Sequence, residues 1–147
     1  MSLTPASSDP VTGLRVLVVD DHMDAAEALG ILLEVFGHDV KTSFDGQQAI
    51  DTIVAWEPDL VLMDLSLPVV DGYEAGKRVQ AHVASHPDFP LPYMAALSGF
   101  SGDAERERTA QCGYARHLVK PVGPDQLKAV IAEAARHRDA RNASAAG

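Results

Sequence analysis

The stretch RVLVVDD at residues 15–21 is the strongest indication of architecture in this chain, because four apolar residues in a row lead directly into two aspartates. A short unbroken apolar run, rich in valine, is typical of a strand that is buried on both faces. The stretch DLVLMD at residues 59–64 repeats this pattern and again ends in an acid. Strands buried on both faces occur mainly in parallel sheets that helices cover on both sides.

Segments with strand and helix patterns alternate around these two runs. Three further strands are expected at 38–43, 93–97 and 115–119. Helical spacing of apolar residues, with glycine or proline at the ends, indicates helices at 25–36, 46–56, 73–85, 103–112 and 123–141. The helix at 103–112 has few apolar residues, and Gly76 interrupts the pattern at 73–85. The alternation predicts an α/β fold: a doubly wound, five-stranded parallel sheet between two layers of helices.

Length and composition indicate one globular domain. The chain has 147 residues, of which 46% are hydrophobic and 22% charged, so neither a disordered chain nor a membrane-spanning one is indicated. We expect a domain at residues 14–141 between a disordered leader at 1–13 and a disordered tail at 142–147. The single cysteine, Cys112, excludes an internal disulfide and suits a reducing, cytoplasmic location.

The charge of the chain limits its partners. The formal net charge is −9, which repels phosphate backbones and argues against nucleic acid as a partner. No apolar run approaches the length of a transmembrane helix, so no membrane contact is expected.

Polar residues are expected at the carboxyl ends of the strands, which is where α/β sheets of this kind place their functional sites. The residues that fall there are Asp20, Asp21, Asp64, Ser98 and Lys120. Three neighbouring carboxylates repel one another and need a cation. Hard oxygen ligands, with no histidine or cysteine at the strand ends, favour Mg²⁺. The metal, an ammonium and a hydroxyl would together hold a phosphoryl group, with one carboxylate as the nucleophile.

Each of these residues has an ordinary alternative explanation. A single aspartate after a strand is commonly a helix N-cap or a solvated loop acid. Five chemically matched residues at one edge of one sheet are difficult to obtain by chance, so the combination carries the interpretation.

Four motifs together resemble the receiver domains of two-component response regulators. They are VVDD at 18–21, MDLSLPVVDG at 63–72, ALSG at 96–99 and HLVKPV at 117–122. The resemblance covers residues 15 to about 138 and implies the flavodoxin-like strand order 2-1-3-4-5. The SGFSG stretch at 98–102 and the HLVKPV motif look most like receivers attached to hybrid sensor histidine kinases.

The resemblance implies a role for each site residue. Asp64 would be the phosphoacceptor, and its donor would be a phosphohistidine on a sensor histidine kinase or a phosphotransfer protein. Mg²⁺ would be held by Asp20, Asp21, Asp64 and the backbone carbonyl of Ser66, with Asp21 as a direct ligand and Asp20 acting through water. Ser98 and Lys120 would contact the phosphoryl oxygens, and Pro121 would follow a cis peptide that aims Lys120 inward.

Two positions depart from the common receiver pattern. His117 stands where tyrosine or phenylalanine is frequent, at the side chain expected to turn inward on activation. An imidazole can change its charge within the physiological pH range, whereas those side chains cannot. Two outcomes remain open: His117 turns toward the site on activation, or it stays solvent-facing and the loops alone form the switch. Ser98 lacks the methyl group of the threonine that is also common there.

Two other functions, one of an enzyme and one of a carrier, fit the sequence less well than that of a receiver. A Mg²⁺-dependent phosphatase of the haloacid dehalogenase type also uses a nucleophilic aspartate, but it needs a second aspartate two residues later, where this chain has Ser66. A flavin or nucleotide carrier needs a glycine-rich or hydroxyl-rich phosphate loop after the first strand, and DDHMDA is acidic instead.

The expected function is therefore that of a signalling domain rather than an enzyme, since it would catalyse only its own phosphorylation and slow dephosphorylation. The last third of the chain is more basic than the rest and is the expected docking face for a downstream protein. We expect a monomer or a weak dimer, either standing alone or cut from a longer protein such as a hybrid kinase.

Overall fold

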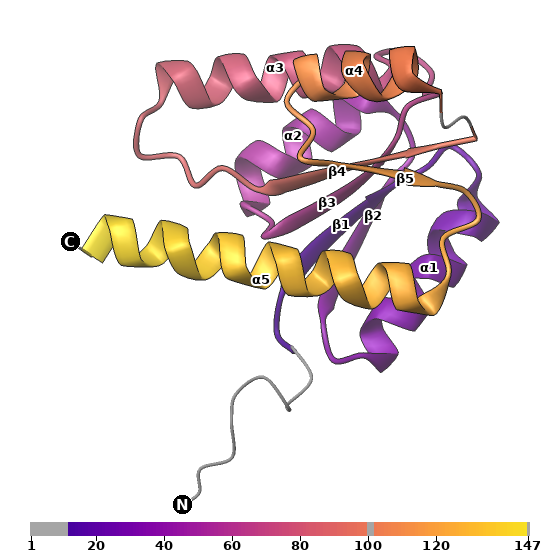
Figure 1. The fold of residues 1–147 in the computed structure, drawn as a ribbon, viewed down its shortest axis with the longest axis horizontal. Coiled ribbons are helices and arrows are strands. Elements are labelled where there is room, and N and C mark those ends of the chain that lie inside the picture. Colours follow the sequence, from indigo (N-terminus) through magenta and orange to yellow (C-terminus); the bar gives the residue numbers. More distant parts are fainter. Residues whose placement is uncertain (1–11, 100–101, 147) are drawn as a thin grey trace, which may run out of the picture.

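A five-stranded parallel sheet forms the centre of the molecule (Figure 1), in a computed structural model that describes residues 12–99 and 102–146. The strands are β1 (Arg15–Val19), β2 (Asp39–Ser43), β3 (Leu60–Asp64), β4 (Tyr93–Ser98) and β5 (Arg116–Val119). The helices are α1 (Met23–Val35), α2 (Gly46–Trp56), α3 (Gly72–Ser85), α4 (Asp103–Gln111) and α5 (Pro124–Ala146). The strand order is β2-β1-β3-β4-β5, which confirms the predicted fold class and topology.

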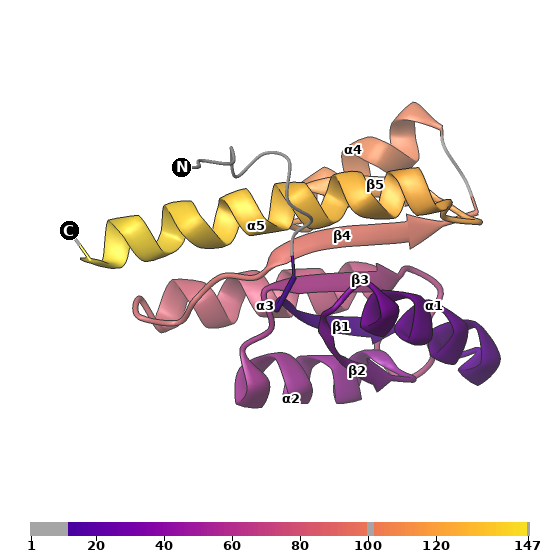
Figure 2. The ribbon, with the colours of Figure 1, turned by 90° about the horizontal axis from the view of Figure 1, so that it is seen from below.

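Helices cover both faces of the sheet, as the apolar runs predicted. Helices α1 and α5 lie on one face and α2, α3 and α4 on the other (Figures 1 and 2). Successive side chains of a strand point to opposite faces, so β1 sends Val16 and Val18 into the α1–α5 core and Leu17 and Val19 into the other core. Burial on both sides is the reason that its sequence is apolar without alternation.

The strands are in register at their carboxyl ends. Val19 of β1 pairs with Met63 of β3, and Ser98 of β4 pairs with Val119 of β5. Residues that directly follow these strands therefore reach the same edge of the sheet.

Gly76 does not interrupt α3, which continues through it to Ser85. A side chain at Gly76 would place its Cβ 2.5 Å from the Cys112 carbonyl oxygen and 2.8 Å from the Tyr114 ring. The glycine therefore permits α3 to pack closely against the segment between α4 and β5. Tyr114 completes this contact by donating a hydrogen bond from its hydroxyl to the Gly72 carbonyl, at 2.6 Å.

The predicted disordered tail at 142–147 is wrong as far as Ala146, because α5 continues to that residue. Three of the six residues at 142–147 are alanine, the residue with the highest helix propensity, which favours continuation of the helix. Most of the predicted leader at 1–13, the residues Phe100 and Ser101 of the SGFSG stretch, and Gly147 lie outside the described residues. Among the described helices, none combines the length and the apolar character needed to cross a bilayer.

Candidate functional site

Two buried aspartates lie side by side at the carboxyl edge of the sheet. Asp64 is the last residue of β3, and Asp20 directly follows β1, its neighbour in the sheet. The parallel register of these two strands brings their ends together. The chain therefore places two carboxylates, separated by more than 40 positions in the sequence, at one corner of the fold.

Lys120 joins these two carboxylates from the end of β5. Its Nζ donates to Asp64 Oδ2 at 2.8 Å and to Asp20 Oδ2 at 3.3 Å. Burial would lower the pKa of Lys120, but the hydrogen bond and charge of Asp64, together with Asp20, outweigh it and raise the pKa above its ordinary value. The side chain is therefore a charged ammonium at neutral pH, held against both acids.

The backbone of Lys120 is paired on one side and precedes a cis peptide on the other. Its N–H donates to the Ser98 carbonyl at 2.8 Å, which continues the pairing of β4 and β5. The peptide bond between Lys120 and Pro121 is cis, as predicted.

Backbone groups stabilise the carboxylates where they stand. Asp20 Oδ1 accepts the His22 N–H at 2.9 Å, and Asp64 Oδ1 accepts the Ser66 N–H at 3.0 Å. Burial would raise the pKa of Asp20, but the His22 N–H and the Lys120 ammonium outweigh this effect and lower it below the ordinary value. Asp20 is therefore anionic at neutral pH.

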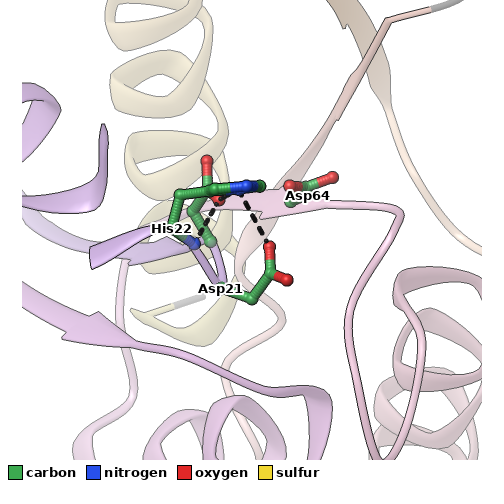
Figure 3. A group of neighbouring side chains, drawn as sticks. Asp21, His22 and Asp64 are labelled. Atoms are coloured by element: carbon green, nitrogen blue, oxygen red, sulfur yellow. Dashed lines mark hydrogen bonds and ion pairs between the residues drawn. The ribbon is translucent and has the colours of Figure 1, made fainter. Parts of the chain in front are cut away.

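Histidine is also part of this site, which the sequence analysis did not predict. The Nδ1 atom of His22 lies 3.2 Å from Asp21 Oδ1 (Figure 3). The same atom lies 3.3 Å from Asp20 Oδ1. Asp20, Asp21, His22 and Asp64 each offer a possible metal ligand, and these four atoms all lie within 4.8 Å of one another. The expectation that no histidine lies at the strand ends is therefore wrong. The signal was the position of His22 directly after the acid pair, at the start of α1.

The donor set fits a divalent cation. Three carboxylates meet here, and one ammonium lies in ion-pair contact with two of them. This excess of negative charge among oxygen donors is the chemistry that Mg²⁺ and related ions require. Ser66 borders the group through the contact of its backbone with Asp64.

Ser98 and His117 occupy different positions relative to the acids. Ser98 is buried at the end of β4, beside Lys120, so it lies at the same edge of the sheet. His117 lies on β5, partly buried, with its Nδ1 3.2 Å from the Thr109 hydroxyl of α4. The same hydroxyl donates a hydrogen bond to the Arg106 carbonyl at 2.8 Å. In this structure His117 is thus linked to α4.

Residues 16–132 match the response regulator receiver domain family. The chain belongs to this family. The match covers the five strands, apart from the first residue of β1, and the site at their ends. The molecule is therefore a receiver domain of two-component systems, and its role is that of a signalling domain.

Relatives of the receiver come from two kinds of regulatory protein. The chain is 30% identical over 125 residues to the probable transcriptional regulator ycf27 of Porphyridium aerugineum, with 85% of the chain and 49% of that protein covered. It is 33% identical over 131 residues to the virulence sensor protein BvgS of Bordetella bronchiseptica, with 87% of the chain and 10% of that protein covered. The chain thus spans about half of the first relative and a tenth of the second. The predicted likeness to receivers of sensor kinases is confirmed.

A solved receiver has the same architecture. The receiver domain of a sensor histidine kinase from Pseudomonas aeruginosa, with magnesium coordinated in its active site cleft, is 28% identical with a TM-score of 0.71. The alignment covers 83% of this chain and 97% of that one. The match favours the receiver over the phosphatase and the nucleotide carrier that the sequence had left as alternatives.

Proposed function

We propose that this receiver accepts a phosphoryl group on Asp64. The observation that carries the proposal is the buried carboxylate of Asp64, which ends β3 and lies 2.8 Å from the ammonium of Lys120. One carboxylate oxygen would attack the phosphorus of a phosphohistidine. The phosphorus–nitrogen bond then breaks, the electron pair and a proton go to the leaving imidazole, and an aspartyl phosphate remains.

Mg²⁺ is the cofactor that we propose for this step. Asp20, Asp21, Asp64 and the backbone carbonyl of Ser66 would hold it, and the Pseudomonas aeruginosa receiver has magnesium in its active site cleft. When bound, the ion supplies positive charge that lowers the repulsion between the carboxylates and the phosphoryl oxygens.

Lys120 and Ser98 would bind the product. The phosphoryl group adds about 1.5–2 negative charges, so it competes with the carboxylates for the Lys120 ammonium. The Ser98 hydroxyl would donate a hydrogen bond to another phosphoryl oxygen. Both residues belong to the ends of neighbouring strands, so binding at the site would shift the loops that follow β4 and β5.

The partners that we propose are proteins. A sensor histidine kinase or a phosphotransfer protein would supply the phosphoryl group, in line with the sensor proteins among the relatives. A downstream protein would bind the last helices, α4 and α5. The receiver would work in the cytoplasm as a monomer or weak dimer, without nucleic acid or membrane.

Intact-mass spectrometry after incubation with acetyl phosphate tests the proposal. The wild-type chain should gain one phosphoryl group in the presence of Mg²⁺ and none after EDTA treatment. Asp64→Asn should gain none, whereas Asp45→Asn, which changes a helix-capping aspartate outside the site, should be labelled as the wild type is. Full labelling of Asp64→Asn, or labelling that EDTA leaves unchanged, would contradict the assignment.

A further inference from the structure

Tyr114, in the segment between α4 and β5, is buried against the first turn of α3. Its hydroxyl donates a hydrogen bond to the Gly72 carbonyl at 2.6 Å, across 42 positions of sequence. Its ring fills the space that Gly76 leaves open, since a Cβ there would lie 2.8 Å from the ring. Burial raises the pKa of Tyr114 above its ordinary value, so the hydroxyl keeps its proton and remains a donor.

Gly72, which accepts this hydrogen bond, packs directly on the backbone at the end of β3. A Cβ at Gly72 would lie 2.6 Å from the Asp64 carbonyl oxygen and 2.7 Å from the Cα of Leu65, so no larger residue fits there. The Gly72 N–H donates to the Leu65 carbonyl at 3.0 Å and closes the loop between β3 and α3. Because the two backbones are in contact, α3 cannot shift at Gly72 without displacing Asp64 and Leu65.

This closed loop carries a backbone group that the proposed magnesium site uses. Ser66 follows Leu65, and its N–H donates to Asp64 Oδ1 at 3.0 Å. Its carbonyl is the proposed metal ligand. A backbone ligand has no rotamer with which to adjust, so its position depends on how firmly the loop is held.

Tyr114 is itself fixed by two other elements. Its N–H donates to the Thr109 carbonyl of α4 at 3.2 Å, and the next N–H, that of Ala115, donates to the Met94 carbonyl of β4 at 2.8 Å. The hydroxyl is therefore presented to α3 from a rigid support.

We propose that Tyr114 is a positioning residue for the site. Its hydroxyl holds the start of α3 against Asp64 and Leu65, and so keeps the Ser66 carbonyl where Mg²⁺ would bind. The inference rests on the proposed function, because it concerns the same loop and the same metal.

Calorimetric titration of Tyr114→Phe with MgCl₂ tests the proposal. The substitution removes the hydroxyl and leaves the ring beside Gly76. Loss of a partner that orients a metal ligand directly costs roughly 10–100-fold in affinity, and Tyr114 acts through Gly72, so we expect a loss near the lower limit, about tenfold.

Tyr93→Phe is the matched control. The Tyr93 hydroxyl also donates to another element, to Glu133 Oε1 at 2.8 Å, but Tyr93 begins β4, at the end of the strand away from the site. The control should bind Mg²⁺ as the wild type does. Urea unfolding of both variants measures their stability separately, because a merely structural hydroxyl would lower stability without changing the Mg²⁺ affinity of the folded chain.

Carbon NMR of the tyrosine rings tests the wild-type chain without any substitution. The Cζ resonance reports on the hydrogen bond of the phenol, so Mg²⁺ should shift the Cζ resonance of Tyr114 and leave that of Tyr93 unchanged. An unaltered Mg²⁺ affinity in Tyr114→Phe, or an unmoved Tyr114 resonance, would overturn the positioning role.

Phosphorylation separates this proposal from the one on which it rests. Phosphorylation of Asp64 together with an unaltered Mg²⁺ affinity in Tyr114→Phe would reject the role of Tyr114 alone. A weakened affinity in a receiver that is never phosphorylated would reject the proposed function instead.

Discussion

Lys120 is the residue on which we expect the response to phosphorylation to depend. In the structure its ammonium is shared between Asp64 and Asp20, at 2.8 and 3.3 Å. A partly exposed ion pair of this kind contributes little to stability in water, so the ammonium can be transferred to a stronger anion at low cost.

Replacing Lys120 with alanine should separate metal binding from the conformational response. Lys120→Ala should still bind Mg²⁺, because all the carboxylates remain. Beryllofluoride, which mimics a phosphoryl group, should then change far fewer backbone chemical shifts than it does in the wild type. Lys77→Ala, at an exposed position on α3, is the matched control. Equal shift changes in Lys120→Ala and the wild type would refute the role.

His38 makes the stability of the fold depend on pH. The ring is buried, its Nδ1 accepts the Leu14 N–H at 3.2 Å, and its Nε2 has no partner among the described residues. Burial, with Arg138 nearby, lowers the pKa of His38 below its ordinary value, against a smaller opposing effect of Asp39. The folded state therefore keeps His38 neutral at pH values where the unfolded chain already binds a proton.

The sign of the effect follows from proton linkage. The unfolded state binds more protons below its own histidine pKa of about 6.5, so stability falls as the pH drops from there toward the folded pKa. The slope for one group is at most about 1.4 kcal/mol per pH unit. Urea unfolding of wild type and His38→Gln at several pH values measures it, and the variant should lose less stability on acidification. Parallel pH profiles of the two chains would contradict this origin.

At the scale of elements, the loop between β3 and α3 contains a strained turn. Val69 has a φ of 67°, which is unfavourable for a β-branched residue. The Val70 N–H donates to the Pro68 carbonyl at 2.8 Å, which closes a tight turn around Val69. The side chain is 82% exposed and contributes nothing to the core, so packing does not compensate for the strain.

Val69→Gly should stabilise the receiver. Relief of a strained φ is worth roughly 1–3 kcal/mol, and the added freedom of glycine in the unfolded chain costs about 0.5–1 kcal/mol. We therefore expect a net gain of about 1 kcal/mol in urea unfolding. Val35→Gly, at an exposed valine in α1, should give no gain because its backbone is helical. A loss of stability in Val69→Gly would show that the turn is not strained.

Arg141, the last residue of the predicted helix, connects the far end of α5 to the rest of the fold. Arg141 donates to the Leu91 carbonyl at 2.9 Å and to Asp59 Oδ1 at 3.3 Å. Asp59 also accepts the Arg15 N–H, at 2.8 Å. These contacts hold the end of the helix against β1 and the loop before β4, on the opposite edge of the sheet from Asp64.

At the scale of the whole molecule, charge determines which partners are accessible. The chain carries a net charge of −9, and phosphorylation makes it more negative. The relative that is a probable transcriptional regulator is matched over about half of its length. We therefore expect an output that uses this domain alone to run through protein contacts.

The receiver domain alone should not bind DNA selectively. Affinity for DNA depends on neutralising phosphates with basic residues, and a chain with 21 acidic and 12 basic residues repels them. Gel-shift measurements at physiological salt, with and without beryllofluoride, should show no sequence-dependent retention. Retention of one sequence over a scrambled one would contradict this.

Sequence patterns were sufficient to predict the parallel sheet and the residues that lie at the ends of its strands. A parallel strand covered on both faces must be apolar throughout, so 16–19 and 60–63 were recognisable without any tertiary contact. Because all parallel strands end at one edge, the position of Asp20, Asp64, Ser98 and Lys120 in the sequence predicted their proximity in space.

Only the tertiary structure decided what these residues contact. The ammonium of Lys120 reaches Asp20 across 100 positions of sequence, and the ring of His22 turns back to the acids instead of capping α1. The reason for a glycine at position 76 within α3 is the close approach of the Tyr114 ring, which comes from a segment distant in the sequence. A sequence pattern records which face a residue occupies. The rotamer and the partner follow from the packing of segments that are distant in the chain, and no local pattern contains that information.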